Sequence, residues 1–291
     1  MLRIYLLLFV FGCTKLLYTQ NYDYIWLLGQ DSQSDLEHAG IVLDFFDDTL
    51  IVYSEFRDTY FRQVNASICD NSGSVLFSTN GLKIYDSAGI TMTNGDGLNP
   101  GALADEWIGV GYSLHQGALS LPFPEKQNEY ILFHKDLERN LNLFRIETHH
   151  FYYSLIDVGN SSETSEVKEK NFPLLDELLA TGKITAVQHA NGRDWWIPVR
   201  RYSSNEYYMF LLSHEGVENT GIQVIGDSIP SGSLGQAVFS PDGTKYVQTN
   251  LHGSQGDPIY INIYDFDRCS GELYNPIQFT YADSAVCLGA A

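Results

Sequence analysis

Residues Gly111–His115 resemble the G-x-S-x-G turn that carries the nucleophilic serine of many hydrolases. That turn needs a glycine at its last position, because the chain bends sharply there between a strand and a helix. This chain has His115 at that position, and no strand–turn–helix pattern surrounds Ser113. The residues therefore argue against a serine nucleophile here.

The histidines are the next candidates for chemistry. His149 and His150 look like a metal pair, but neighbouring residues on a strand point to opposite faces, so a shared ion would require a bulge. The other histidines considered are scattered and lack His-Glu-x-x-His spacing: His134, His189, His214 and His252. We interpret all of them as surface or structural residues and predict no metal site.

Two loops come close to known ligand-binding patterns. Asp265–Glu272 resembles half of a calcium loop but lacks the later carboxylates and the bidentate glutamate. A hairpin turn without an ion is favoured, so we expect no cofactor, and calcium stays an unsupported alternative. Gly95–Gly101 resembles a dinucleotide loop but has one residue too many and a proline where a helix should begin. A turn-rich connection is the better interpretation.

Trp195 and Trp196 form an adjacent aromatic pair. Successive side chains of a strand alternate between faces, so we expect at least one of the two rings in a hydrophobic core. The other ring is then available to stack on a sugar or a peptide.

An internal repeat indicates which elements position these residues. Thr185–Trp196 aligns with Gln236–Val247 through a shared Ala-Val, an Asn/Asp-Gly turn and an aromatic residue, and Ser67–Phe77 follows the same frame. The small residues that open the units are 51, 68, 51 and 48 residues apart: Ser67, Ala118, Ala186, Ala237 and Ala285. A period near 50 residues is typical of stacked repeats.

Each unit combines short apolar strands around a turn with a third strand such as Tyr207–Leu212 or Ile259–Asp265. Four strands in roughly 50 residues predict an all-β fold, a β-propeller of four-stranded blades. We expect five to six blades, with an incomplete seven-bladed ring as an open alternative. The long step is assigned to a polar insertion at Gly159–Lys170, and Phe172–Leu179 is expected to form one or two helical turns.

In a propeller, the residues just before each innermost strand surround the entrance of the central channel. The repeat places five positions there: Asn65, Gln116, Thr185, Gln236 and Asp283. This ring is polar and mostly uncharged, which favours hydrogen bonds to a polar ligand over acid–base catalysis. A water-filled channel without a ligand is the other open interpretation.

Four segments carry a family resemblance: Asn65–Gly81, Asn94–Gly101, His189–Trp196 and Gln236–Val247. Together they resemble secreted bacterial β-propeller proteins of the WD40-like or PD40 kind, which often end in a sorting domain of the type IX secretion system. The resemblance implies a seven-bladed or similar propeller, export, and no assigned activity. The chain departs from the pattern after Ser284, where a new unit starts and stops, so we expect a truncated last blade.

The N-terminus predicts export. Arg3 precedes an apolar run of 9 residues, Ile4–Gly12, and a segment of polar and aromatic residues begins at Asn21. Such a run is typical of a signal peptide and is too short for a transmembrane helix, which needs about 20 residues. We assign residues 1–20 to the signal and 21–291 to the propeller, with an extracellular, cell-surface or periplasmic location. A lipid anchor at Cys13 is the alternative.

Three cysteines remain beyond the signal, Cys69, Cys269 and Cys287. Their spacing matches no zinc site, and an odd number allows at most one disulfide within the chain. We expect buried, unpaired thiols.

Net charge and composition limit the classes of molecule that the chain can bind. The 291 residues are 44% hydrophobic and carry a net charge of −19. The apolar fraction supports a full core, and the negative surface is repelled by nucleic acids. We therefore predict an exported binding or interaction module without catalysis, whose ligand is a protein or glycan. The alternatives are a propeller hydrolase of glycans, lactones or peptides, with or without calcium, and a non-functional fragment of a larger surface protein.

Overall fold

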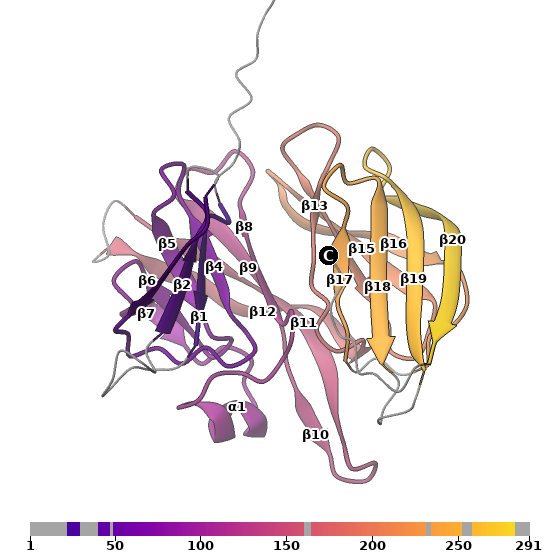
Figure 1. Ribbon diagram of the computed structural model, residues 1–291, viewed down its shortest axis with the longest axis horizontal. Coiled ribbons are helices and arrows are strands. Elements are labelled where there is room, and N and C mark those ends of the chain that lie inside the picture. Colours follow the sequence, from indigo (N-terminus) through magenta and orange to yellow (C-terminus); the bar gives the residue numbers. More distant parts are fainter. Residues whose placement is uncertain are drawn as a thin grey trace, which may run out of the picture.

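The computed structural model describes residues 22–29, 40–46, 49–159, 164–230, 234–251 and 258–282. Within these ranges the chain consists of β-strands and one short helix, α1 (Ala102–Trp107), so the expected all-β fold is confirmed. The first sheets lie on one side of the molecule and the last two on the other, with the long strands β11 and β12 between them (Figure 1).

The N-terminal half forms two antiparallel sheets. The first has three strands: β1 (Ile25–Leu28), β2 (Gly40–Asp44) and β3 (Ile51–Glu55). The second has four strands in chain order: β4 (Ala66–Cys69), β5 (Val75–Thr79), β6 (Lys83–Asp86) and β7 (Thr91–Asp96).

The next four-stranded unit is the longest. Its strands are β8 (Ala118–Pro122), β9 (Glu129–Lys135), β11 (Arg145–Asp157) and β12 (Glu166–Leu179). A short strand, β10 (Glu138–Asn140), pairs with the start of β11 and forms a hairpin that projects from the body (Figure 1). Strands β12 and β7 touch in parallel at Glu166 and Thr93, which joins the two units at their outer strands.

Two further four-stranded antiparallel sheets complete the described chain. One contains β13 (Val187–Gln188), β14 (Trp195–Arg200), β15 (Glu206–Ser213) and β16 (Gly216–Val224). The other contains β17 (Ala237–Phe239), β18 (Lys245–Leu251), β19 (Ile259–Asp267) and β20 (Glu272–Tyr281).

The sequence repeat corresponds to these units. The opening strands β4, β8, β13 and β17 begin at or beside the expected small residues, and the expected third strands are β15 and β19. Turn chemistry explains the regularity. Asp70 Oδ1 accepts hydrogen bonds from the amides of Ser72 and Ser74 at 2.8 and 3.0 Å, and Gly73 takes a φ of 82° in the same turn. The arrangement is propeller-like.

Apolar side chains between successive units hold them together in chain order. Ile68 and Phe77 of the β4–β7 sheet share a core with Leu132 and Ile156 of the next unit. The following interface contains Phe133, Phe151, Ile197 and Phe210. The last contains Trp196, Tyr207, Tyr246 and Tyr264. Each four-stranded unit therefore covers its neighbour, as expected for sheets that cannot bury both faces alone.

Two expectations about the 68-residue interval between Ala118 and Ala186 are wrong. Residues 166–170 of the expected insertion and all of Phe172–Leu179 belong to β12, which pairs with β11 along most of its length. Ladder hydrogen bonds and sheet packing outweigh the weak helical preference of a short segment. Pro173 fits because β12 pairs with β7 only at Glu166, so the edge of β12 that faces away from β11 has no hydrogen bond at Pro173 for a missing amide donor to interrupt. The extra length also includes the β10–β11 hairpin.

The cysteine expectation holds in part. Cys69 is buried and free, and burial raises the pKa of its thiol to about 11. Cys269 is free but exposed, because it lies in the tight turn between β19 and β20, so the expectation of burial is wrong there.

Several sequence-based expectations concern residues outside the described ranges. These are the signal peptide at 1–20 with Cys13, the position of Asp283, Cys287, and the unit that starts at Ser284. In the described part of the chain, no helix has the length and apolar character needed to cross a membrane.

Candidate functional site

Four of the five residues expected at a channel entrance lie in the described part of the chain. Gln116 binds the residue after Gln236: its Oε1 accepts from the Ala237 amide at 2.8 Å, and its Nε2 donates to the Ala237 carbonyl at 2.9 Å. Asn65 donates instead to the Leu27 carbonyl of β1 at 3.4 Å. Thr185 lines a separate cleft of about 460 Å³. Asp283 lies outside the described residues, and the channel-entrance role of all five stays a prediction.

A larger cleft, which we call the turn cleft, has a volume of about 930 Å³. It is bordered by the turns that join the first and second strands of three consecutive units, and by the β11–β12 connection. Its aromatic and charged lining residues include Tyr22, Asp70, Phe123, Glu125, Lys126, Tyr130, Arg193 and Trp195. A cleft of the same volume between the β1–β3 and β4–β7 sheets is lined by none of the expected site residues.

The tryptophan pair behaves as expected from strand alternation. Trp196 is buried, and its indole Nε1 donates to the Arg268 carbonyl at 3.0 Å. Trp195 is half-buried and packs on one side against the core between the second and third four-stranded units. It also lines both the turn cleft and the cleft that contains Thr185. One ring therefore stabilises the fold, and the other borders open space.

The charged groups beside Trp195 are held in place. Arg193 Nη1 donates to Glu125 Oε1 at 2.7 Å, which links the β13–β14 turn to the β8–β9 turn. The same guanidinium contacts both oxygens of Asp194, at 2.8 and 3.0 Å. Hydrogen bonds from Arg193 lower the pKa of the Asp194 carboxyl below its usual value. The polar groups near the indole are thus already oriented before any ligand arrives.

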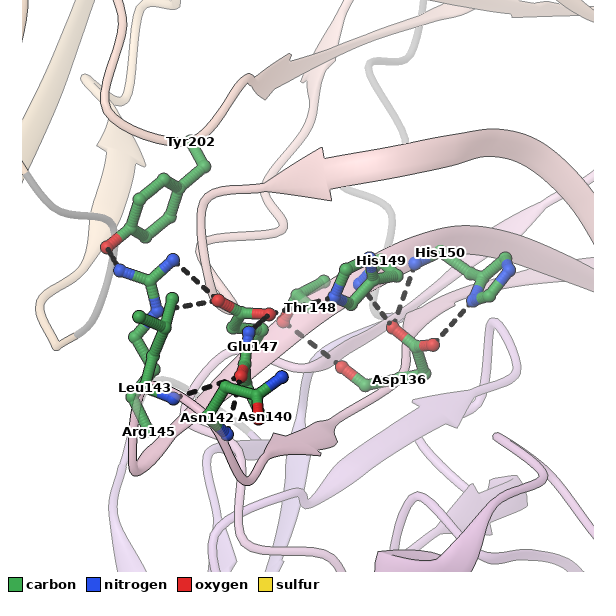
Figure 2. Close-up of polar contacts among 10 residues, drawn as sticks. All are labelled: Asp136, Asn140, Asn142, Leu143, Arg145, Glu147, Thr148, His149, His150 and Tyr202. Carbon is green, nitrogen blue, oxygen red and sulfur yellow. Dashed lines mark hydrogen bonds and ion pairs between the residues drawn. The ribbon is translucent and has the colours of Figure 1, made fainter.

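A second cluster of polar residues lies where β9 ends and the β10–β11 hairpin begins (Figure 2). Asp136 is buried, and its Oδ1 accepts the backbone amides of His149 at 2.9 Å and of His150 at 2.8 Å. Its Oδ2 accepts from His150 Nδ1 at 2.6 Å. Two successive amides directed at one oxygen mark an irregular stretch of β11, where its pairing with β12 also shifts register.

His149 has a different partner. Its Nε2 donates to Glu147 Oε2 at 3.1 Å, while His150 is bound to Asp136 (Figure 2). Burial alone would raise the pKa of Glu147, but hydrogen bonds from Asn140, Arg145 and His149 lower it. The two neighbouring histidine side chains therefore have different partners, although both of their backbone amides donate to Asp136.

His150 does meet residues that sequence spacing could not connect. Asp136, Glu138 and His150 each offer a ligand atom, and these atoms lie within 4.8 Å of one another. In the described part of the chain this is the one group of three such donors. A weak sequence signal was the Asp-x-Glu spacing at 136–138, which puts both carboxylates on one face if the chain is extended. His150 joins them only through sheet pairing.

His134 is a structural residue, as expected. It is fully buried; its Nδ1 lies 2.7 Å from Asn99 Oδ1 and its Nε2 lies 2.9 Å from Ser154 Oγ. The Asn99 side-chain amide donates to the Gly81 carbonyl at 2.9 Å, which leaves its oxygen facing the imidazole. Burial lowers the pKa of His134 to about 3.

The remaining motifs lie in loops, turns and strand ends. Ser113 lies in a loop, and its hydroxyl is hydrogen-bonded to Gln63 Oε1 at 2.8 Å. The turn between β19 and β20 is closed by Asp267, whose Oδ1 accepts from the Cys269 amide at 2.7 Å. Asp265 is paired with Lys245. Gly95–Gly101 covers the end of β7 and a turn-rich connection to α1.

Comparisons with known proteins do not assign a family. No protein-family model matches this chain, and no curated protein matches its sequence. Among solved structures, one similar chain is a protein of unknown function from Desulfotomaculum acetoxidans, with 11% identity and a TM-score of 0.36 over 91% of this chain and 72% of that chain.

Two other solved structures are less similar. A triple mutant of AofleA from Arthrobotrys oligospora shares 7% identity, with a TM-score of 0.26 over 90% of each chain. A eukaryotic initiation factor shares 10% identity, with a TM-score of 0.22 over 89% of this chain and 85% of that chain. Similarity at this level carries no conclusion about function.

Proposed function

We propose that this chain is an exported β-propeller binding module that holds a glycan in the turn cleft, with the indole of Trp195 as its stacking platform. The observation that carries the proposal is the position of Trp195, packed on a core on one side and bordering two clefts. Rigid aromatic side chains at the edge of open space are a recurrent means of binding ligands with both apolar and polar surfaces.

The propeller part of the proposal rests on the repeated four-stranded units. Their opening strands recur at the repeat positions, and their cores lie between consecutive units. We propose four complete blades and count the three-stranded β1–β3 sheet as an incomplete fifth.

The chemistry of the turn cleft suits a neutral glycan. A pyranose ring offers an apolar face for the indole and hydroxyl groups for fixed donors and acceptors. Arg193 and Glu125 form an ion pair that links two turns at the cleft. Asp70 and Asn128 also line the turn cleft. The net charge of −19 disfavours anionic ligands at long range.

Replacing Trp195 by Ala is expected to weaken glycan binding by at least tenfold, because the stacking surface is removed. The measurement is a glycan-array screen of the full chain, followed by titration calorimetry with the strongest glycan. Trp26→Ala is the matched control, since Trp26 is 50% exposed on β1 and lines neither of the clefts that Trp195 borders. Its affinity should match that of the unmodified chain.

A second variant tests the turn cleft even if Trp195→Ala fails to fold. Glu125 is exposed, so Glu125→Ala should leave the melting temperature unchanged and weaken binding several-fold. If glycan binding is unaffected by both variants, or if only peptides bind the turn cleft, the proposal is wrong.

Export is supported by the signal-like segment Met1–Gln20. When the full gene is expressed in a bacterial host, we expect secreted protein that starts at Asn21, which intact-mass measurement would detect. A mass that includes residues 1–20, or a lipid-modified Cys13, would contradict this processing.

A further inference from the structure

We infer that Asp136, Glu138 and His150 form a binding site for a divalent transition-metal ion of the zinc type. The site lies at the base of the β10–β11 hairpin and shares no residue with the turn cleft. Its three donor atoms lie within 4.8 Å of one another, a spacing that one ion can span with small side-chain movements.

Asp136 is oriented for this role by the backbone. Its Oδ1 accepts two amide hydrogens from β11, and its backbone carbonyl accepts from Thr148 Oγ1 at 3.1 Å. These contacts hold the carboxylate so that Oδ2 faces His150 (Figure 2). Outer hydrogen bonds of this kind fix a metal ligand before the ion binds.

His150 is held but remains accessible. Its ring stacks on Tyr152, with centroids 5.1 Å apart and planes 12° apart, and its side chain is 24% exposed. Nε2 lies 3.3 Å from Oδ1 of Asp176, which is 81% exposed, so Asp176 can accept the Nε2 hydrogen while Nδ1 faces the ion. An ion can thus enter from solvent without displacing the core.

The ion would take the place of the hydrogen between His150 Nδ1 and Asp136 Oδ2, and the ring would then carry its hydrogen on Nε2, beside Asp176 Oδ1, so that the bound imidazole is neutral. Glu138 is exposed at the start of β10 and can rotate inward to complete the set. Three protein ligands leave a coordination position for water, so the site is open.

The donor set selects the class of ion. One imidazole nitrogen and two carboxylates suit zinc and its neighbours in the first transition row. Calcium requires six to eight oxygen ligands. The described cluster offers two carboxylates and one imidazole nitrogen, so it suits calcium poorly.

The test is titration calorimetry of the full chain with zinc chloride at 0.15 M salt, with calcium chloride as the comparison. We expect one zinc ion per chain, and at least tenfold weaker binding for Glu138→Gln and for His150→Gln. His149→Gln is the matched control: it removes the adjacent imidazole, which contacts Glu147, and its zinc affinity should stay within twofold.

Glu138→Gln keeps the test decisive, because an exposed side chain can be changed without unfolding the hairpin. Nitrogen NMR of the imidazoles adds a structural readout: zinc should shift a ring nitrogen of His150 and leave His149 unchanged. The inference is overturned if zinc shows no saturable binding, if Glu138→Gln and His150→Gln bind as the unmodified chain does, or if calcium binds more tightly than zinc.

Discussion

Lowering the pH from 7 to 4 is expected to destabilise the folded protein by about 3 kcal/mol through His134 alone. The imidazole is fully buried, and burial lowers its pKa from 6.5 to about 3. With Asn99 Oδ1 as acceptor, Nδ1 carries the hydrogen and Nε2 accepts from the Ser154 hydroxyl. A second proton on Nε2 would therefore force the Ser154 hydroxyl, which also accepts from the Asn171 amide, to turn its hydrogen away.

The direction of the effect follows from proton binding. The unfolded chain binds a proton at His134 near pH 6.5, whereas the folded chain does so only near pH 3. Between these values the unfolded state holds more protons, so the free energy of unfolding falls as the pH falls. The loss begins below pH 6.5 and is complete below about pH 3.

Urea denaturation of the unmodified chain and of His134→Gln at pH 7, 6, 5 and 4 measures this contribution. Glutamine supplies a donor and an acceptor but does not titrate. Several carboxyls with lowered pKa values, such as those of Asp194 and Asp265, also lose stabilising interactions in acid. Because both proteins contain them, the difference in slope isolates His134, and equal slopes would contradict the prediction.

Replacing Trp196 by Ala is expected to lower the free energy of unfolding by about 3–5 kcal/mol. The ring is 4% exposed and fills the interface between the third and fourth four-stranded units. It packs so closely on Gly271 that a Cβ at that position would lie 2.8 Å from the ring. Its removal leaves a cavity and takes away one of two hydrogen bonds to the Arg268 carbonyl, which also accepts from the Ala190 amide at 3.0 Å.

Trp196→Phe separates the two contributions. It keeps an aromatic ring in the core but removes the Nε1 donor, so we expect a smaller loss of about 1–2 kcal/mol. Urea denaturation at pH 7 measures both variants. A loss below 1 kcal/mol for Trp196→Ala would show that this interface contributes little to stability.

The repeat shows how far local sequence information reaches. Ala118 and Ala237 were expected to open strands, and β8 and β17 begin there. The Asp-containing turns are equally local, because Asp70 and its amide partners are at most four residues apart. Interactions of this range leave a pattern that can be recognised without knowing the fold.

Phe172–Leu179 shows where local information fails. In isolation its leucines and acidic residues are compatible with a helical turn, but β11 provides a long ladder that outweighs this preference. The hydrogen bond from Gln116 to the Ala237 carbonyl shows the same limit for a side chain, because the two residues are 121 positions apart in the sequence.

The amino-acid sequence by itself determined the all-β composition, the repeat, the positions of the turns and the burial of one of two adjacent tryptophans. Each depends on residues close together in the chain or on the alternation of a strand. Only the tertiary structure decided that Asp136 meets His150, that His134 lies between Asn99 and Ser154, and that Trp195 borders two clefts. These contacts join residues 14 to 35 positions apart, or turns of different units, and so depend on strand pairing and sheet packing, which leave no fixed spacing in the sequence.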